Sequence, residues 1–314
     1  MKIYRYILEP YNGIKTRYRC PECNDKNKTF TLYIDTLTGE YLHNTVGRCN
    51  RESKCGYHYS PKEYFEENKN EVSLKNTNKD LNDSTFTNTI KATSFIDIEI
   101  FKSSLINYET NNFIKYLINF FGIEITNKLI NQYFIGSSKH WIGSTVFWQI
   151  DIKGKVRAGK IMLYNSFTGK RIKELFNHIN WVHKTIGEKD FEVNQCFFGE
   201  HLLHEKSKPI AIVESEKTAI IASAYLPNFL WLAVGSLTNL NLRKCNILMG
   251  RIVILFPDLN GYEKWKRKAN EFSHHINITV SDLLERKATV IERKQGLDLA
   301  DYLIRFKLRE FILK

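Results

Sequence analysis

The chain has 314 residues, 43% of them hydrophobic, which is ordinary for a folded protein and long enough for two or three domains. Its formal net charge of +12 favours a polyanionic partner, which for a soluble protein usually means nucleic acid. No apolar run approaches the roughly 18 residues of a membrane-spanning helix, and the first residues lack the apolar core of a signal peptide, so we expect a cytoplasmic protein with no membrane partner.

Residues 1–66 have the pattern of a small metal-binding module. Four of the six cysteines fall here, and in a reducing compartment such clustering indicates a metal site rather than disulfides. The cysteines form two pairs, and an alternating strand at 29–35, followed by a turn, lies between the pairs. Two such knuckles joined by a hairpin predict a zinc ribbon with one structural Zn²⁺. Its predicted ligands are Cys20, Cys23, Cys49 and Cys55.

The fourth zinc ligand has two candidates. Five residues separate Cys49 from Cys55, a wider gap than the usual spacing of about two to four residues. His58 is therefore an alternative to Cys55, although the glycine directly after Cys55 is typical of a ribbon knuckle.

Residues 67–93 are dominated by Asn, Lys, Glu, Asp, Thr and Ser, with scattered apolar residues and no periodicity. Such a segment cannot bury enough apolar surface to order itself, so it is predicted to be a flexible linker. We expect the first domain boundary to fall within it.

Residues 94–207 form a predicted mixed α+β domain of basic character. Helical periodicity at 111–121 and 126–132 precedes a β meander at 141–164. Cations interleaved with tryptophans suit single-stranded nucleic acid, because phosphates meet charge and bases stack on rings; the alternative is a solvated charged face. The cations predicted to bind nucleic acid are Arg157, Lys160, Lys170 and Arg171, with Trp141, Trp148 and Trp181 nearby.

Residues 208–314 contain two short, largely β-branched runs that each lead to an acidic residue. The runs at 210–213 and 252–256 are typical of buried parallel strands, and they precede Glu214 and Asp258. Because ligands bind at the carboxyl ends of such strands, the two carboxylates could converge on one site, where hard oxygen ligands favour Mg²⁺. The alternative is that each residue only caps the helix after its strand.

The segments Val213–Ala219 and Phe256–Gly261 resemble the Toprim domain shared by bacterial primases, topoisomerases and some nucleases. In that family a strand-end glutamate and a later Asp-x-Asp bind catalytic metal. The resemblance implies this role for Glu214 and Asp258 in a parallel-sheet domain, and it puts Asn260 at the second Asp position.

The resemblance extends to residues 295–303, which are similar to the acidic segment that often closes a Toprim domain. It makes Asp298 and Asp301 further candidate ligands of magnesium. Lys217 lies one turn into the helix after Glu214, from where it could reach a substrate phosphate.

The predicted fold is thus α/β, with a zinc ribbon, a basic mixed domain and a Toprim-type domain in that order. The order resembles the primase-like proteins of plasmids, phages and integrative elements. It implies a primase-type DNA-directed RNA polymerase, a nucleotidyltransferase that acts on single-stranded DNA and nucleoside triphosphates with Mg²⁺ or Mn²⁺ during replication of a mobile genetic element. Any replicative helicase would be a separate partner, because the sequence has no G-x4-GK[ST] loop.

Two other functions remain open. A Toprim nuclease would use the same acidic site to cut DNA. A non-catalytic DNA-binding protein with a degenerate Toprim core would not need that site, and Asn260, which removes one negative charge from it, keeps this alternative open.

Overall fold

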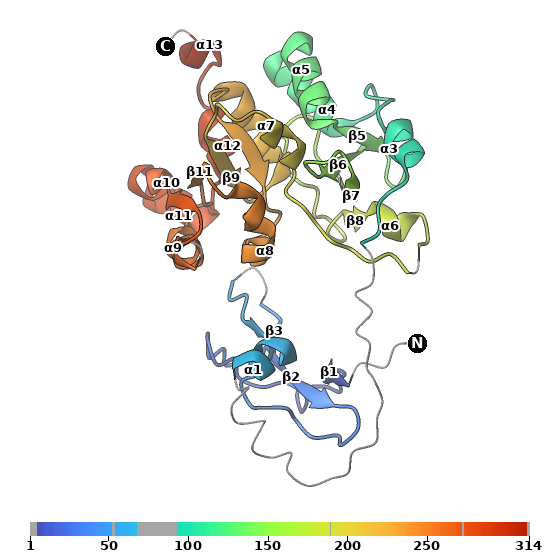
Figure 1. The fold of residues 1–314 in the computed structure, drawn as a ribbon, viewed down its shortest axis with the longest axis vertical. Coiled ribbons are helices and arrows are strands. Elements are labelled where there is room, and N and C mark those ends of the chain that lie inside the picture. The colour runs from blue at the N-terminus through green and yellow to red at the C-terminus, as the bar shows by residue number, and fades with distance from the viewer. Residues whose placement is uncertain (1–4, 52–53, 68–92, 189, 272, 313–314) are drawn as a thin grey trace. The chain divides into compact units, whose positions relative to one another are not determined.

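The computed structural model describes residues 5–51, 54–67, 93–188, 190–271 and 273–312 (Figure 1). The chain divides into two compact units, Met1–Asn88 and Thr89–Lys314. The linker expected at 67–93 lies almost wholly outside the described residues.

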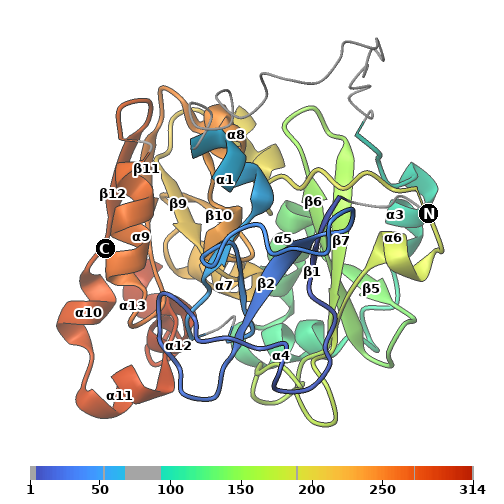
Figure 2. The same cartoon turned by 90° about the horizontal axis from the view of Figure 1, so that it is seen from below.

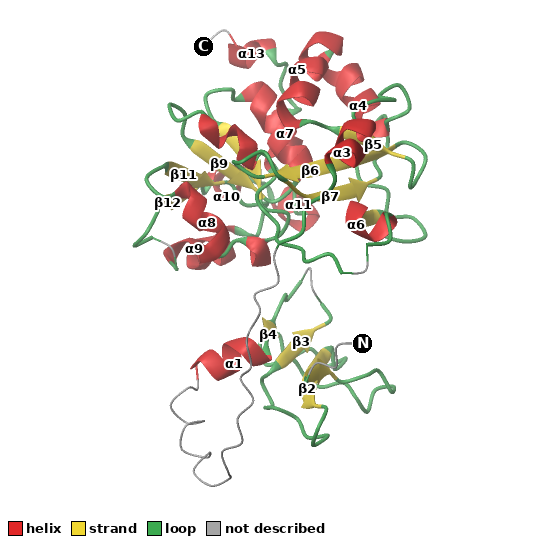
Figure 3. Cartoon of the chain, turned by 45° about the vertical axis from the view of Figure 1, so that its right-hand side comes forward, coloured by secondary structure: helices red, strands yellow, loops and turns green. Residues whose placement is uncertain are grey.

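The first unit is a four-stranded antiparallel sheet followed by a short helix. Strands β2 and β3 lie side by side in Figure 3, and Phe30 of β2 is paired with Cys49 of β3. The small core of this unit contains Phe30 and Leu32 together with two of the cysteines. The elements are β1 (Tyr6–Leu8), β2 (Phe30–Asp35), β3 (Gly47–Cys49), β4 (His58–Tyr59) and α1 (Pro61–Glu67).

The second unit begins with helices packed on an antiparallel sheet, as expected for its mixed α+β part. Asn111 caps helix α4, because its Oδ1 accepts hydrogen bonds from the backbone N–H groups of Phe113 (3.1 Å) and Ile114 (3.2 Å). Gly159 faces Trp148 across the sheet, where an added Cβ would lie 2.4 Å from the indole ring, so only glycine fits. The helices are α3 (Ile98–Ser104), α4 (Asn112–Phe121), α5 (Ile123–Tyr133) and α6 (Val182–Thr185), and the strands are β5 (Gly136–Ser138), β6 (Ser144–Ile150), β7 (Val156–Met162) and β8 (Ile179–Trp181).

A four-stranded parallel sheet follows, with the strand order β10-β9-β11-β12. The two runs predicted to be buried strands are β9 and β11, which pair directly in parallel with Leu255 opposite Ile212. Helix α7 starts at the cap Ser215, whose Oγ accepts a hydrogen bond from Thr218 N (3.2 Å). The strands are β9 (Ile210–Val213), β10 (Leu230–Ala233), β11 (Ile252–Leu255) and β12 (Asn277–Val280).

The remaining helices surround the parallel sheet. Figure 2 shows α9 alongside β12. These helices are α7 (Glu216–Tyr225), α8 (Leu242–Cys245), α9 (Tyr262–Asn270), α10 (Leu283–Lys287), α11 (Val290–Gln295), α12 (Leu299–Leu303) and α13 (Arg309–Ile312), and the 3-10 helices are η1 (Glu200–His204), η2 (Leu237–Asn239) and η3 (Asn246–Leu248).

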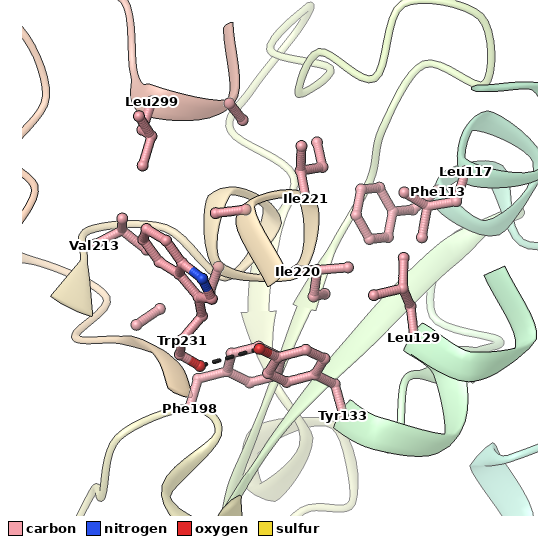
Figure 4. Packing of buried hydrophobic residues seen from close by; sticks show 14 of the residues in the cluster. Phe113, Leu117, Leu129, Tyr133, Phe198, Val213, Ile220, Ile221, Trp231 and Leu299 are labelled. Atoms are coloured by element: carbon pink, nitrogen blue, oxygen red, sulfur yellow. Dashed lines mark hydrogen bonds between the residues drawn. The ribbon is translucent and has the colours of Figure 1, made fainter. Parts of the chain in front are cut away.

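One hydrophobic cluster joins the antiparallel and the parallel parts of the second unit (Figure 4). Tyr133 stacks on Phe198 with the ring centres 5.2 Å apart, and its hydroxyl donates to the carbonyl oxygen of Trp231 at 3.1 Å. Ile220 and Ile221 of α7 are fully buried in the same cluster. Their packing fixes the position of α7, and with it the position of the acidic residues near the start of this helix.

The expected fold class, α/β with an N-terminal zinc ribbon and a later parallel sheet, is confirmed. In the described part of the chain, no helix is both long enough and apolar enough to cross a membrane.

Candidate functional site

The four predicted zinc ligands converge in the first unit. Their sulfur atoms all lie within 4.8 Å of one another. Cys20 Sγ is 3.7 Å from Cys55 Sγ, and Cys23 Sγ is 4.0 Å from Cys49 Sγ. Four sulfurs at about 2.3 Å from a tetrahedral Zn²⁺ would stand about 3.8 Å apart, so the cluster has the size of a structural zinc site.

The geometry favours Cys55 over His58 as the fourth ligand. His58 Nε2 is 2.9 Å from the hydroxyl of Tyr33, and the two rings are stacked with their centres 6.1 Å apart. Burial, together with contacts to the other three cysteines, raises the pKa of Cys55 to about 12. A bound Zn²⁺ would have to displace its proton.

The second unit gathers acidic side chains at the carboxyl edge of the parallel sheet. Glu214 directly follows β9 and Asp258 follows the neighbouring strand β11, and both are half-buried. Burial raises the pKa of Glu214 above its ordinary value. Burial, together with the nearby charges of Asp298 and Glu214, raises the pKa of Asp258 well above its ordinary value. Asp258 therefore lies close enough to Asp298 and Glu214 for their charges to act on it.

Lys217 forms ion pairs with Asp298 and Asp301, the two further candidate ligands of magnesium. Its Nζ lies 3.5 Å from Asp298 Oδ2 and 3.8 Å from Asp301 Oδ1. Burial by itself lowers the pKa of Lys217, but the two carboxylates raise it above its ordinary value. Asp298 and Asp301 also cap α12 reciprocally, and Thr218 Oγ1 donates to Asp298 at 2.8 Å. All three predicted residues are thus engaged in one internal network beside Asp258.

The basic sheet contributes a second ion pair that the sequence did not predict. Lys160 of β7 lies 3.1 and 3.2 Å from the two carboxylate oxygens of Glu216, and the two side chains are only 12% and 2% exposed. Lys160 and Arg171 both counteract the raised pKa of Glu214 through their charge, so both approach the acidic edge. Lys160 therefore faces the acidic site and is not an exposed phosphate contact.

The other predicted nucleic-acid contacts lie in different surroundings. Arg157 is paired with Asp151 through its Nε (2.6 Å). Lys170 and Arg171 are exposed. Trp148 is 1% exposed and donates from Nε1 to Ser104 Oγ, so it belongs to the core and is unable to stack on a base.

Asn260 is not among the groups that the structure gathers around Asp258. Its side-chain Nδ2 donates to the carbonyl oxygen of Arg293 at 2.6 Å, and its backbone N–H donates to Glu285 Oε1 at 2.8 Å. Its φ of 67° lies in the left-handed region, which asparagine tolerates better than most residues. The side chain that the resemblance puts at the second Asp position therefore hydrogen-bonds to the main chain of Arg293.

The sequence missed Glu216 and Thr218. Glu216 could have been considered because it stands two residues after Glu214, but nothing in the sequence shows that Lys160, 56 positions earlier, reaches it. Among the residues that the structure describes, the four cysteines form the only group of three or more Cys, His, Asp or Glu ligands within 4.8 Å of one another. A cation at the acidic edge would thus have few carboxylate ligands and several waters, as Mg²⁺ often does.

Two family descriptions match parts of the chain. Residues 4–70 match a zinc beta-ribbon finger family, and residues 111–259 match a domain of unknown function (DUF6371). The first match agrees with the cysteine cluster, and the second includes both Glu214 and Asp258. No curated protein matches the sequence.

Three solved structures are similar to the chain at low identity. The primase fragment of the bacteriophage T7 primase-helicase protein is 12% identical with a TM-score of 0.42, over 95% of this chain and 97% of that chain. The Aquifex aeolicus primase (zinc-binding and RNA polymerase domains) is 13% identical with a TM-score of 0.38, over 98% of this chain and 79% of that one. The RNA polymerase domain of Mycobacterium tuberculosis primase DnaG is 8% identical with a TM-score of 0.41, over 69% of this chain and 81% of that chain.

Proposed function

We propose that this protein is a primase-like nucleotidyltransferase that acts on single-stranded DNA through a Toprim-type acidic site. The observation that carries the proposal is the position of Glu214 and Asp258 at the carboxyl ends of two paired parallel strands. Ligands bind at this edge of such sheets. The resemblance of both segments to Toprim domains supports metal-dependent phosphoryl chemistry at this edge.

The donor set at the acidic edge fits a hard divalent cation. Glu214 and Asp258 supply carboxylate oxygens, and both have raised pKa values, chiefly through burial and, for Asp258, also through the charges of Asp298 and Glu214, which a cation would offset. Mg²⁺ or Mn²⁺ held by these two residues would supply charge neutralisation for a nucleoside triphosphate and its attacking 3′-hydroxyl.

The cationic residues around this edge differ in their partners: two form ion pairs with carboxylates and one is exposed. Lys217 forms ion pairs with both Asp298 and Asp301, so it offsets one of their two negative charges next to the metal ligands. Lys160 holds Glu216 in place at the start of α7. Arg171 is exposed and close enough to Glu214 to lower its pKa, so it is the cation best placed to contact an incoming phosphate.

The zinc ribbon and the basic sheet complete the proposal. In this account the ribbon is a structural Zn²⁺ module, and Lys170 and Arg171 contact the DNA backbone. The sequence resemblance extends the proposal to replication of a mobile genetic element together with a separate helicase.

One assay separates this function from its two alternatives. Labelled single-stranded DNA is incubated with the full chain and Mg²⁺ or Mn²⁺, with and without ribonucleotides. The proposal predicts new, ribonucleotide-dependent products on the template. Shortened DNA without added nucleotides would indicate a nuclease, and unchanged DNA that is nevertheless bound would indicate a non-catalytic DNA-binding protein.

A further inference from the structure

A cavity of about 410 Å³ lies in the second unit, bordered by β7, by the residues before η1 and by the η2–α8 segment. Its size is that of a small-molecule site. Most of its lining is polar, and the side chains that matter here are Arg157, Asn194, Gln195, Asn239, Asn241 and Lys244.

Lys244 has a buried charge in the wall of this cavity. Within the part of the chain that the structure describes, its Nζ is inaccessible to solvent and has no hydrogen-bond partner. The face of Phe197 lies 5.5 Å from Nζ, measured to the ring centre, and the charges of Glu200 and Glu216 favour the ammonium from farther away. Burial lowers the pKa of Lys244. An ammonium without an acceptor in such a place is costly, which points to an acceptor that arrives from outside.

Arg157 brings a second cation to the cavity. Its Nε is used by Asp151, and its guanidinium lies over the ring of Phe95 at 5.0 Å. Its two terminal amino groups make no hydrogen bond to any described residue, so they can serve an anion. The carboxylate that also lines the cavity, Glu200, is turned toward the backbone, since its oxygens accept from the N–H groups of Phe197 (3.1 Å) and Ile152 (3.4 Å).

Side-chain amides provide donors and acceptors beside the cations. Asn239 Nδ2 donates to Gln195 Oε1 at 3.3 Å, which leaves the Gln195 side-chain amino group and the side-chain oxygen Oδ1 of Asn239 for other partners. A neighbouring amide donor and acceptor of this kind match the edge of a nucleobase, as they do in nucleic-acid recognition.

We propose that this cavity binds the phosphate of a nucleotide, with Lys244 and Arg157 as the anion ligands and the Gln195–Asn239 amide pair against the base. The phosphate has two possible sources, a free nucleoside triphosphate or the backbone of single-stranded DNA. The proposal deepens the function proposed above and rests on it for the identity of the nucleotide as substrate or template.

The cavity adjoins the acidic edge through the turn after β10. Gly235 N donates to the carbonyl oxygen of Glu214 at 2.8 Å. A Cβ added to Gly235 would lie 3.7 Å from Asn239 Nδ2 and 4.0 Å from Glu216 Oε1. The cavity therefore lies beside the main chain of Glu214 and the carboxylate of Glu216, next to the edge proposed to hold the catalytic cation.

The test is equilibrium binding by the full chain of two probes, ATP and the oligonucleotide dT8, in EDTA so that the acidic edge carries no divalent cation. The variants are Lys244→Met, which keeps the aliphatic stem, Lys244→Arg, which restores the charge, and Lys264→Met on the exposed face of α9 as the matched control. We expect Lys244→Met to weaken binding of at least one probe about tenfold or more, Lys244→Arg to recover part of it, and the control to bind as wild type does.

The two probes identify the source of the phosphate. Loss of ATP binding alone indicates a nucleoside triphosphate site, and loss of dT8 binding alone indicates a DNA backbone contact. Thermal unfolding of Lys244→Met should show an intact fold, with a midpoint equal to or above that of wild type, because a buried charge has been removed. Unchanged affinity of Lys244→Met for both probes, or no binding of either probe by wild type, overturns the proposal.

Failure of this site is distinguishable from failure of the proposed function. Primer synthesis with unchanged probe binding by Lys244→Met would refute the cavity and keep the polymerase. If wild type makes no primer but its probe binding depends on Lys244, the polymerase function would be refuted and the nucleotide site in the cavity would be kept.

Discussion

Glu214 and Asp258 are placed where their negative charges are unfavourable. Both are withdrawn from water, and the pKa of each is raised by that burial. A carboxyl group with a higher pKa in the folded than in the unfolded protein binds more protons when folded, so its ionised form lowers the free energy of unfolding at neutral pH. Strain of this kind at the carboxyl edge of the sheet is typical of functional sites.

Replacing Asp258 with Asn should therefore stabilise the metal-free protein. We expect the free energy of unfolding, measured with urea at pH 7 in EDTA, to rise by about 0.5–2 kcal/mol. The same variant should lose the increase in melting temperature that Mg²⁺ gives wild type. Glu263→Gln on exposed α9 serves as a control without effect on either quantity. A variant that is less stable than wild type and still responds to Mg²⁺ would contradict this interpretation.

The buried Lys160–Glu216 ion pair should contribute to the stability of the folded protein. Lys160→Met would leave the carboxylate of Glu216 buried without a partner, so we expect it to lower the free energy of unfolding by about 3–5 kcal/mol. The double variant Lys160→Met, Glu216→Leu should recover most of that loss, as a double-mutant cycle can measure. Lys170→Met, at an exposed position, is the control. An unaltered unfolding curve for Lys160→Met would show that the pair is unimportant.

At the scale of the elements, the sequence predicted what local chemistry determines. The strands β9 and β11, the cap Ser215 and the cysteine knuckles each follow from residues that are neighbours in the chain. The contacts that could not be predicted join residues that are far apart in the chain. Asn260 is held by Arg293, 33 positions away, and Thr218 reaches Asp298 across 80 positions. Periodicity and spacing in the sequence carry no information about contacts between distant residues. The ion pairs of Lys217 with Asp298 and Asp301 could therefore be identified only in the folded structure.

We expect the ribbon to depend on a bound zinc ion, because its own core contains few apolar residues. Elemental analysis should find about one zinc per chain. Cys55→Ala should lose most of it, whereas His58→Ala should retain it, because His58 is directed at Tyr33. Retention of zinc by Cys55→Ala together with its loss in His58→Ala would reverse the assignment.

For the whole molecule, the charge of +12 predicts electrostatic and largely sequence-independent binding of single-stranded DNA. Because Lys170 and Arg171 are exposed, replacing each with Ala should flatten the dependence of log affinity on log salt by roughly 0.7. Lys264→Ala should leave the slope unchanged. A slope that does not change in the Lys170→Ala, Arg171→Ala double variant would exclude these two residues as phosphate contacts.

The most direct test is the rate of template-dependent ribonucleotide incorporation by the full chain, measured as Mg²⁺ or Mn²⁺ is raised from zero. With wild type, incorporation should be absent in EDTA and should saturate with the cation. Glu214→Gln, which keeps the shape of the side chain and removes its charge, should fold normally and lose about 100-fold or more of the rate. Incorporation that persists in EDTA, or that Glu214→Gln supports as well as wild type does, would contradict a catalytic cation at this edge.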